Sequence, residues 1–358
     1  MSVGLDTQGI KSMVETQTYP AMLWEKKPDN KVYCFLCSWE CLISPGKLGR
    51  CQVRQNIDGE LVSLNYHHIC AANIDPIEKK PLFHFMPGST SFSVACVGCN
   101  FQCDFCQNWQ ISQMPLREHR IDGEAVSPNN LVEIAQRNHC QSISYTYTEP
   151  TIFFELAYDT SRRAHEVGIK NIFVSNGYMT PQALETIEPW LDAINVDLKS
   201  FREDYYRRVC HGHLEPVLRS LRWLAKSRIW FEVTTLIVPE QNDSEEELRD
   251  IARFIAEELG PHVPWHVSRF HPDYKMTGIG GTPTSTVELA LAIGKAAGLR
   301  YCYGGNIPIH LSESTHCYQC GQTLIERWGF SIRQNKIKDG KCPSCETPVD
   351  GVAMDWGV

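Results

Sequence analysis

Three thiols stand at a spacing that can hold an iron–sulfur cluster, in the stretch Cys99-Asn-Phe-Gln-Cys103-Asp-Phe-Cys106. A cuboidal [4Fe–4S] cluster that is held by three cysteines keeps one iron without a protein ligand. That open iron can bind a substrate-like molecule as well as pass an electron. The alternatives are three unrelated cysteines or part of a zinc site. Zinc usually takes four tetrahedral ligands from C-x2-C pairs, which the three-residue gap fits poorly.

Two further sets of four cysteines suggest metal sites elsewhere in the chain. The N-terminal group is Cys34, Cys37, Cys41 and Cys51, and the C-terminal group is Cys317, Cys320, Cys342 and Cys345. The N-terminal group is close enough in sequence to share one metal site, and both zinc and a second iron–sulfur cluster remain open. A fourth cysteine would close that site, so we interpret it as non-catalytic. The C-terminal group forms two C-x2-C pairs, which is a strong signal for a zinc ribbon.

Composition describes an ordinary globular chain. Of the 358 residues 42% are hydrophobic and 21% are charged, and the net charge is −8. A net negative charge gives no overall electrostatic attraction to nucleic acid or to an anionic membrane, so neither is expected as a partner. No apolar stretch is long enough for a membrane span, and no export signal is recognisable at the N-terminus. Clustered thiols in such a chain indicate a reducing compartment, and we expect a cytoplasmic protein.

Strand and helix patterns alternate from about residue 91 onward. We predict strands at 91–95, 142–147, 171–175, 193–198, 230–238 and 266–270, and helices at 128–139, 151–167, 181–188, 214–227, 244–259 and 284–297. This alternation predicts an α/β fold with a parallel sheet, and about six units fall short of a full eight-unit barrel. The expected domains are an N-terminal extension (1–30), a Cys-rich metal module (31–85), a partial (β/α)6 barrel (86–312) and a zinc ribbon (313–358).

Polar residues follow the predicted strands where the apolar runs end. In a barrel of parallel strands the active site lies at these carboxyl ends. The candidates for binding a cofactor are Thr148, Glu149, Ser175, Asn176, Asp197, Lys199 and His271. A surface ion pair for Asp197 with Lys199 and an ordinary loop position for His271 are the competing interpretations. No catalytic side chain is assigned. Cys210 stands beside two histidines and is retained as a possible substrate-facing group.

The cysteine spacing resembles the signature of the radical S-adenosylmethionine (radical SAM) superfamily, and the barrel resembles its pyruvate formate-lyase activating enzyme branch. The resemblance implies that SAM binds the open iron and is cleaved reductively to a 5′-deoxyadenosyl radical. Thr148-Glu149-Pro150 matches a Gly-Gly-Glu-Pro motif that holds the SAM amino group, although Tyr147-Thr148 replaces the glycines. Asp197-Leu-Lys199 matches a segment whose Lys pairs with the SAM carboxylate. Ser175-Asn176-Gly177 matches a turn near the ribose, and His271 a histidine beside SAM.

From about residue 30 to its end the chain is similar to the radical SAM component of the AmmeMemoRadiSam system. The marks are the N-terminal group followed by Gln-Val-Arg54, the segment from Asp75 to His84, the segment 265–276 and the terminal ribbon. Ser38-Trp39 replaces the Pro-His usual between the second and third cysteines. Membership implies partners similar to Memo and AMMECR1 proteins, and a reductant such as flavodoxin or ferredoxin.

The main hypothesis is therefore a radical SAM oxidoreductase that resembles activating enzymes and abstracts hydrogen from an unidentified substrate, for which a protein residue is one class. Its cofactors would be the [4Fe–4S] cluster, SAM and Zn²⁺. The rival hypothesis is a non-catalytic iron–sulfur or zinc protein that transfers electrons or acts as a scaffold. The rival requires a fourth cluster ligand, for which Cys96 is the nearest thiol, but its place in a strand body makes that role unfavourable.

Overall fold

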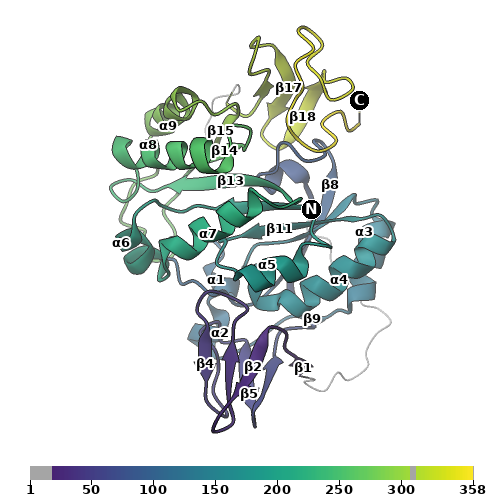
Figure 1. The fold of residues 1–358 in the computed structure, drawn as a ribbon, viewed down its shortest axis with the longest axis vertical. Coiled ribbons are helices and arrows are strands. Elements are labelled where there is room, and N and C mark those ends of the chain that lie inside the picture. Colours follow the sequence, from purple (N-terminus) through teal and green to yellow (C-terminus); the bar gives the residue numbers. More distant parts are fainter. Residues whose placement is uncertain (1–17, 307–311, 358) are drawn as a thin grey trace. The chain divides into compact units, whose positions relative to one another are not determined.

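The computed structural model describes residues 18–306 and 312–357 (Figure 1). The chain consists of two compact units. Unit 1 consists of Met1–Asp75, Thr90–Gln102 and Asn108–Asp192. Unit 2 consists of Pro76–Ser89, Cys103–Gln107 and Ala193–Val358. Residues 1–17 of the predicted N-terminal extension lie outside the described residues. The chain therefore enters each unit more than once.

Unit 1 is built on strands in the order β11-β10-β8-β7-β9. Their bounds are β7 His68–Pro76, β8 Thr90–Cys96, β9 Glu124–Ala125, β10 Ser142–Tyr145 and β11 Lys170–Ser175. Strands β8, β10 and β11 run parallel, with Ser142 level with both Ser91 and Lys170. Nearly every residue of β8 and β10 is buried, as expected for parallel strands that are covered on both faces.

Helices follow these strands along the chain. They are α1 Trp109–Ser112, α2 Met114–Glu118, α3 Pro128–Arg137, the 3₁₀ turn Pro150–Phe153, α4 Phe154–Glu166 and α5 Pro181–Ile187. Two of them begin with the sequence signals of a helix start. The hydroxyl of Ser127 accepts the Asn130 amide at the start of α3, and Thr180 does the same for Ala183 in α5. A proline stands at the first helical position of both.

Two small antiparallel sheets occupy the N-terminal part of unit 1, in the orders β1-β6-β5 and β2-β3-β4. Their strands are β1 Tyr19–Pro20, β2 Trp24–Lys27, β3 Lys31–Cys34, β4 Cys41–Ile43, β5 Arg54–Ile57 and β6 Glu60–Ser63. Asp58 and Gly59 both have positive φ and close the β5–β6 hairpin, as an Asp-Gly turn predicts. Strands β1 and β2 fall in a segment for which the sequence predicted no element.

Unit 2 holds parallel strands in the order β15-β14-β13-β12. They are β12 Ala193–Asp197, β13 Trp230–Ile237, β14 Trp265–Arg269 and β15 Cys302–Gly305. The α-helices are α6 Glu203–Tyr205, α7 Leu214–Leu224, α8 Glu245–Phe254 and α9 Thr284–Ala296, with π-helical turns at Tyr206–Cys210 and Ile255–Leu259. Strand β15 was not predicted, because it is short and contains two glycines.

The C-terminal part of unit 2 is an antiparallel sheet of β16 Thr315–His316, β17 Thr323–Trp328 and β18 Ser331–Asn335. The segment 76–89, with a 3₁₀ turn at Ile77–Lys79, packs inside the same unit. The amide of His84 donates to the Glu232 carboxylate at 2.8 Å, and its ring nitrogens contact Asp350 O and the Tyr303 hydroxyl. Buried Arg327 donates to Phe83 O at 2.9 Å. These contacts explain why residues 76–89 belong to unit 2.

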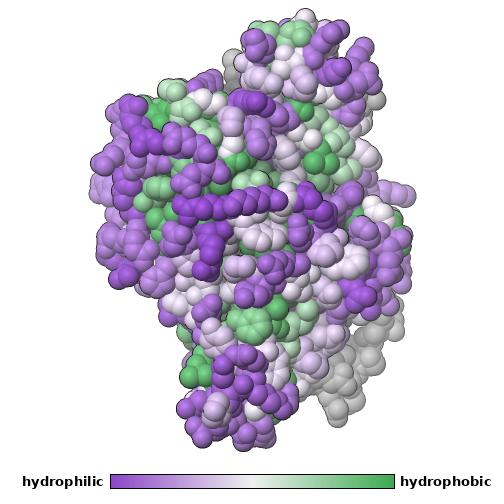
Figure 2. Space-filling view, viewed as in Figure 1, coloured by the Kyte–Doolittle hydropathy of each residue, from purple (hydrophilic) through white to green (hydrophobic). Residues whose placement is uncertain are grey.

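The predicted alternation of strands and helices is confirmed. All six predicted strands appear as β8 and β10–β14, and the predicted helices appear with ends shifted by a few residues. None of the described helices has the length and apolar character that crossing a bilayer requires. On the face drawn in Figure 2, hydrophobic residues lie in small patches between hydrophilic ones.

Candidate functional site

One loop, which directly follows β8, carries the three cysteines of the C-x3-C-x2-C motif. Gly98 opens this loop with φ of +110°, and a Cβ there would lie 3.1 Å from Val53 Cγ1 and 3.3 Å from Ile152 Cδ1. Only glycine meets both demands, so the residue before Cys99 is constrained by backbone angle and by space. The Cys99 thiol accepts the amide of Phe101 at 3.4 Å, and Phe101 is buried.

Cys103 and Cys106 belong to unit 2, where the second part of the loop is held by residues 209–211 and 275. The amide of Asp104 donates to Val209 O at 3.0 Å, and its carboxylate accepts Lys275 Nζ at 2.9 Å. Cys103 is buried, and its thiol lies 4.0 Å from the carbonyl oxygen of Cys210. Cys210, retained from the sequence as a substrate-facing candidate, is thus fully buried beside a motif cysteine.

Glu149 is the central carboxylate of unit 1. Its Oε1 accepts hydrogen bonds from the Thr151 amide, the Thr151 hydroxyl and the Ser175 hydroxyl, at 3.0, 2.6 and 2.8 Å. Its Oε2 accepts the amide of Asn176 at 2.8 Å. Burial raises the pKa of Glu149, and these donors oppose the rise. The Glu149 side chain therefore links the turn after β10 with the turn after β11 through hydrogen bonds.

Asn176 connects that turn to the cluster loop within unit 1. Its side-chain nitrogen Nδ2 donates to Asn100 Oδ1 at 2.7 Å and lies 3.9 Å from the Cys99 thiol. The Nδ2 of Asn100 is buried and has no hydrogen-bond partner within the described part of the chain. A buried amide donor without a partner is costly unless a ligand supplies an acceptor. Sequence reasoning did not assign Asn100, although it stands inside the motif.

Asp197 and Lys199 form a close pair at the end of β12, with Lys199 Nζ 2.8 Å from Asp197 Oδ2. Burial acts to lower the pKa of Lys199, but the carboxylate of Asp197 outweighs it and holds that pKa well above its usual value. The ammonium lies 5.6 Å from the centre of the Phe105 ring, which belongs to the cluster loop. Lys199 thus stays charged beside this loop.

The remaining candidates are distributed over both units. Thr148 donates its hydroxyl to Cys96 O at 2.8 Å in unit 1. His271 follows β14 in unit 2 and is exposed. Two donors of unit 2 that the sequence did not single out are buried without a partner within the described residues: Thr234 Oγ1 inside β13 and Arg269 Nε at the end of β14. Orphan donors of this kind suit a polar ligand.

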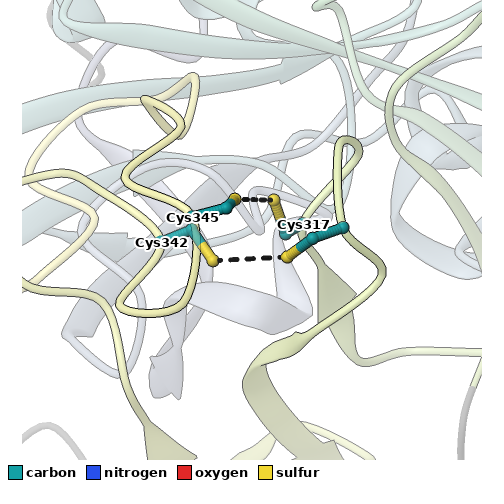
Figure 3. A group of neighbouring side chains, drawn as sticks. Cys317, Cys342 and Cys345 are labelled. Carbon is teal, nitrogen blue, oxygen red and sulfur yellow. Dashed lines mark hydrogen bonds between the residues drawn. The ribbon is translucent and has the colours of Figure 1, made fainter.

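The C-terminal group can hold a metal ion. Its four ligand atoms lie within 4.8 Å of one another, with Cys317 3.6 Å from Cys345 and Cys320 3.7 Å from Cys342 (Figure 3). Four sulfurs at about 2.3 Å from one tetrahedral ion lie about 3.8 Å apart, which matches these distances. A hydrogen bond with the Thr347 hydroxyl at 3.2 Å lowers the pKa of Cys345 to about 6, which favours the thiolate that a metal needs.

The loop fits a [4Fe–4S] cluster with an open iron. One short loop carries the three thiols, Phe101 and Phe105 on it are buried, and Asn100 offers a donor without a partner. Donors toward cluster sulfur and an apolar surround are the features that tune such clusters. Cys96 is completely buried at the end of β8, with a pKa raised far above its usual value by burial, so its environment disfavours the thiolate of a fourth ligand.

Comparison with known proteins identifies a family and relatives of similar sequence. The model of the radical SAM superfamily matches residues 93–255. An uncharacterized protein of Methanocaldococcus jannaschii, MJ0808, is 45% identical over 332 residues, which cover 92% of this chain and 98% of that protein. A second one, MJ0674, is 21% identical and covers 68% of this chain and 67% of its own length.

Solved structures with a related arrangement include a domain of a pyruvate-formate lyase-activating enzyme from Bacteroides vulgatus. It is 16% identical, covers 46% of this chain and 99% of its own, and has a TM-score of 0.41. A radical SAM methyltransferase from Sphaerobacter thermophilus is 16% identical over 66% of this chain and 70% of its own, with a TM-score of 0.49. The family follows from the cysteine motif, the match to the superfamily model and the relative that is 45% identical over 92% of the chain. The chain belongs to the radical SAM superfamily, whose members bind a [4Fe–4S] cluster and SAM.

Proposed function

We propose that this protein is a radical SAM oxidoreductase of the activating-enzyme type. When bound, the cluster supplies the electron that cleaves SAM to a 5′-deoxyadenosyl radical, which takes a hydrogen atom from the substrate. Cys99, Cys103 and Cys106 would hold the cluster. The observation that supports this proposal best is the loop itself, on which three thiols are accompanied by the unpartnered Asn100 amide.

The residues of unit 1 would position SAM through the backbone. Glu149 already accepts four hydrogen bonds, so its task is to fix the Thr148 turn and the Ser175-Asn176 turn against each other. The carbonyl groups of the Thr148 turn would then face the SAM amino group. Asn176 would hold the loop beside Cys99, because its amide contacts both Asn100 and that thiol.

In unit 2, Lys199 would pair with the SAM carboxylate. Its ammonium stays charged because Asp197 supports it, and Phe105 flanks it. His271 is exposed after β14 and would contact SAM from the end of that strand. The buried aromatic residue Phe105 on the loop would help to exclude water from the reacting atoms.

The wider assignment rests on sequence resemblance. We propose that the chain is the radical SAM component of the AmmeMemoRadiSam system and works with proteins similar to Memo and AMMECR1. Flavodoxin or ferredoxin would supply electrons, and a protein residue or a small molecule would be the substrate. The C-terminal group would hold Zn²⁺, since its sulfur distances fit one tetrahedral ion.

The test is anaerobic reconstitution followed by electron paramagnetic resonance of the reduced protein with and without SAM. We expect a [4Fe–4S]⁺ signal that changes shape when SAM is added, together with 5′-deoxyadenosine in the products. Cys103→Ala should abolish the SAM-dependent change. Cys140→Ala, which removes a buried thiol outside the three cysteine groups, is the matched control and should retain the SAM-dependent change. A signal indifferent to SAM, without 5′-deoxyadenosine, would support the electron carrier or scaffold instead.

A further inference from the structure

The N-terminal group surrounds one cavity in unit 1. Its four cysteines line this cavity together with Leu36, Ile43, Arg54, Thr151 and Ile152. Cys34 and Cys41 are level with each other on the paired strands β3 and β4, and a Cβ at Gly49 would lie 3.2 Å from Ile43 Cδ1 and 3.9 Å from the Cys51 sulfur. Four thiols that line a small, mostly apolar cavity form a built site rather than four separate thiols.

The sulfur spacing of this group differs from that of a single zinc ion. Within the described residues, only the C-terminal group brings three or more ligand atoms of His, Cys, Asp or Glu within 4.8 Å of one another. The N-terminal thiols share a cavity, but no three of their sulfurs lie within 4.8 Å of one another. One tetrahedral zinc requires sulfurs about 3.8 Å apart, whereas a cluster gives each thiolate its own iron and spreads the sulfurs. The wider set therefore favours a cluster.

A buried arginine supports negative charge at this site. The Nη1 of Arg54 donates to the Cys34 thiol at 3.2 Å and to Met22 O at 3.0 Å. Its guanidinium also pairs with Glu155, and both side chains are at most 2% exposed. A charged donor on a cluster thiolate stabilises the reduced, more negative form of the cluster. Such a contact suits a redox centre.

Trp39 joins this site to the catalytic loop. It lies between Cys37 and Cys41, and its indole nitrogen donates to the carbonyl of Asn100 at 2.8 Å. Asn100 is the neighbour of Cys99 in the chain. The Trp39 ring also lies 5.3 Å from that of Tyr178, and the Ser38 amide donates to Tyr178 O at 3.0 Å. A path of two peptide units, the Trp39 side chain, one hydrogen bond and a third peptide unit thus connects Cys41 with Cys99.

We infer that Cys34, Cys37, Cys41 and Cys51 hold a second [4Fe–4S] cluster, which passes electrons to the catalytic cluster through Trp39 and Asn100. The electron transfer to the catalytic cluster rests on the proposed function, whereas the presence of a second cluster does not. A low-potential one-electron donor such as flavodoxin reduces the N-terminal cluster, which is reoxidised when the electron moves on. No bond forms or breaks and no proton moves in this transfer.

The first experiment counts metals and does not depend on SAM. The triple variant Cys99→Ala/Cys103→Ala/Cys106→Ala is reconstituted with iron and sulfide, and its iron, zinc and paramagnetic signal are measured. We expect about four irons, about one zinc and a [4Fe–4S]⁺ signal per chain. About two zinc and no iron would overturn the inference while leaving the proposed function intact.

The second experiment tests the electron path. Cys41→Ser/Cys51→Ser and Trp39→Phe are compared for 5′-deoxyadenosine formation with reduced flavodoxin and with dithionite, which reaches the catalytic cluster directly. We expect rates at least about tenfold lower with flavodoxin in both variants and close to wild type with dithionite. Trp24→Phe is the matched control, because its indole donates to Ala21 O within the same module. Equal losses with both reductants would indicate a structural role, and no loss with either would exclude the path.

Discussion

The two sets of four cysteines have the same ligand type and number but differ in geometry. In the C-terminal group, two pairs of sulfurs lie 3.6 and 3.7 Å apart, between the β16–β17 connection and the segment after β18, and two of the four residues are exposed. In the N-terminal group they line a cavity that a buried arginine shares. Ligand count alone therefore does not identify a metal. In our proposal, the sulfur spacing and the charge beside the thiolates distinguish a site for one ion from a site for a cluster.

Removal of the metal from the C-terminal group should have the largest effect. Cys317 and Cys342 belong to the core of their small sheet, so the binding energy of the ion, on the order of 10 kcal/mol, is largely folding energy there. A zinc chelator should make residues 312–357 sensitive to protease and leave the iron absorbance unchanged, as limited proteolysis with a spectrum of the same sample would show. Loss of iron colour at the same chelator concentration would contradict the distinction between the groups.

Replacement of Arg54 should have the second largest effect. Arg54→Met leaves the buried Glu155 without its counter-charge, and we expect a loss of about 3–5 kcal/mol in the free energy of unfolding. Urea titration measures this loss. The double variant Arg54→Met/Glu155→Leu removes both charges and should regain most of the stability. If the double variant were as unstable as the single one, packing rather than charge would explain the effect.

Acid should loosen unit 2 through His84. Burial lowers the pKa of His84 to about 4, against about 6.5 in an unfolded chain. The folded state thus favours the neutral ring, and stability is full above pH 6.5 and declines as the pH falls toward 4. The expected loss is on the order of 3 kcal/mol. Urea titrations across this range measure it, and His84→Gln should flatten the profile. An unchanged slope in that variant would assign the pH dependence to other groups.

Thr347→Val should have the smallest effect. Its hydroxyl contacts the Cys345 thiol at 3.2 Å and lowers the pKa of that thiol, so its removal should raise the pKa and weaken metal binding about tenfold. Competition with a chromogenic chelator measures the affinity. The pH at which half of the metal is lost should also rise. Thr323→Val, which changes a hydroxyl of the same sheet that contacts His316, is the control and should leave the affinity unchanged.

Local patterns predicted the parts of this molecule that depend on neighbouring residues. The cysteine spacing predicted a four-thiol group at 317–345, and apolar runs predicted strands such as β8 and β13. Strands β1 and β15 escaped prediction because two or four residues carry too little periodicity. Two of the four hydrogen bonds to Glu149 come from Ser175 and Asn176, at the end of another strand, so these two could not be predicted from the local sequence. The contact between Trp39 and Asn100 joins residues 61 positions apart and leaves no trace in either local sequence.

The assignment of residues 76–89 to unit 2 has a consequence for synthesis on the ribosome. This segment leaves the ribosome long before Glu232, Tyr303, Arg327 and Asp350, to which its backbone and His84 ring are bonded. Contacts over such sequence separations form late and slow folding. Until the last residues emerge, Phe83 and Phe85 lack their final environment. A nascent chain would thus present an apolar segment that a chaperone could bind, and truncation before residue 350 would make that exposure permanent.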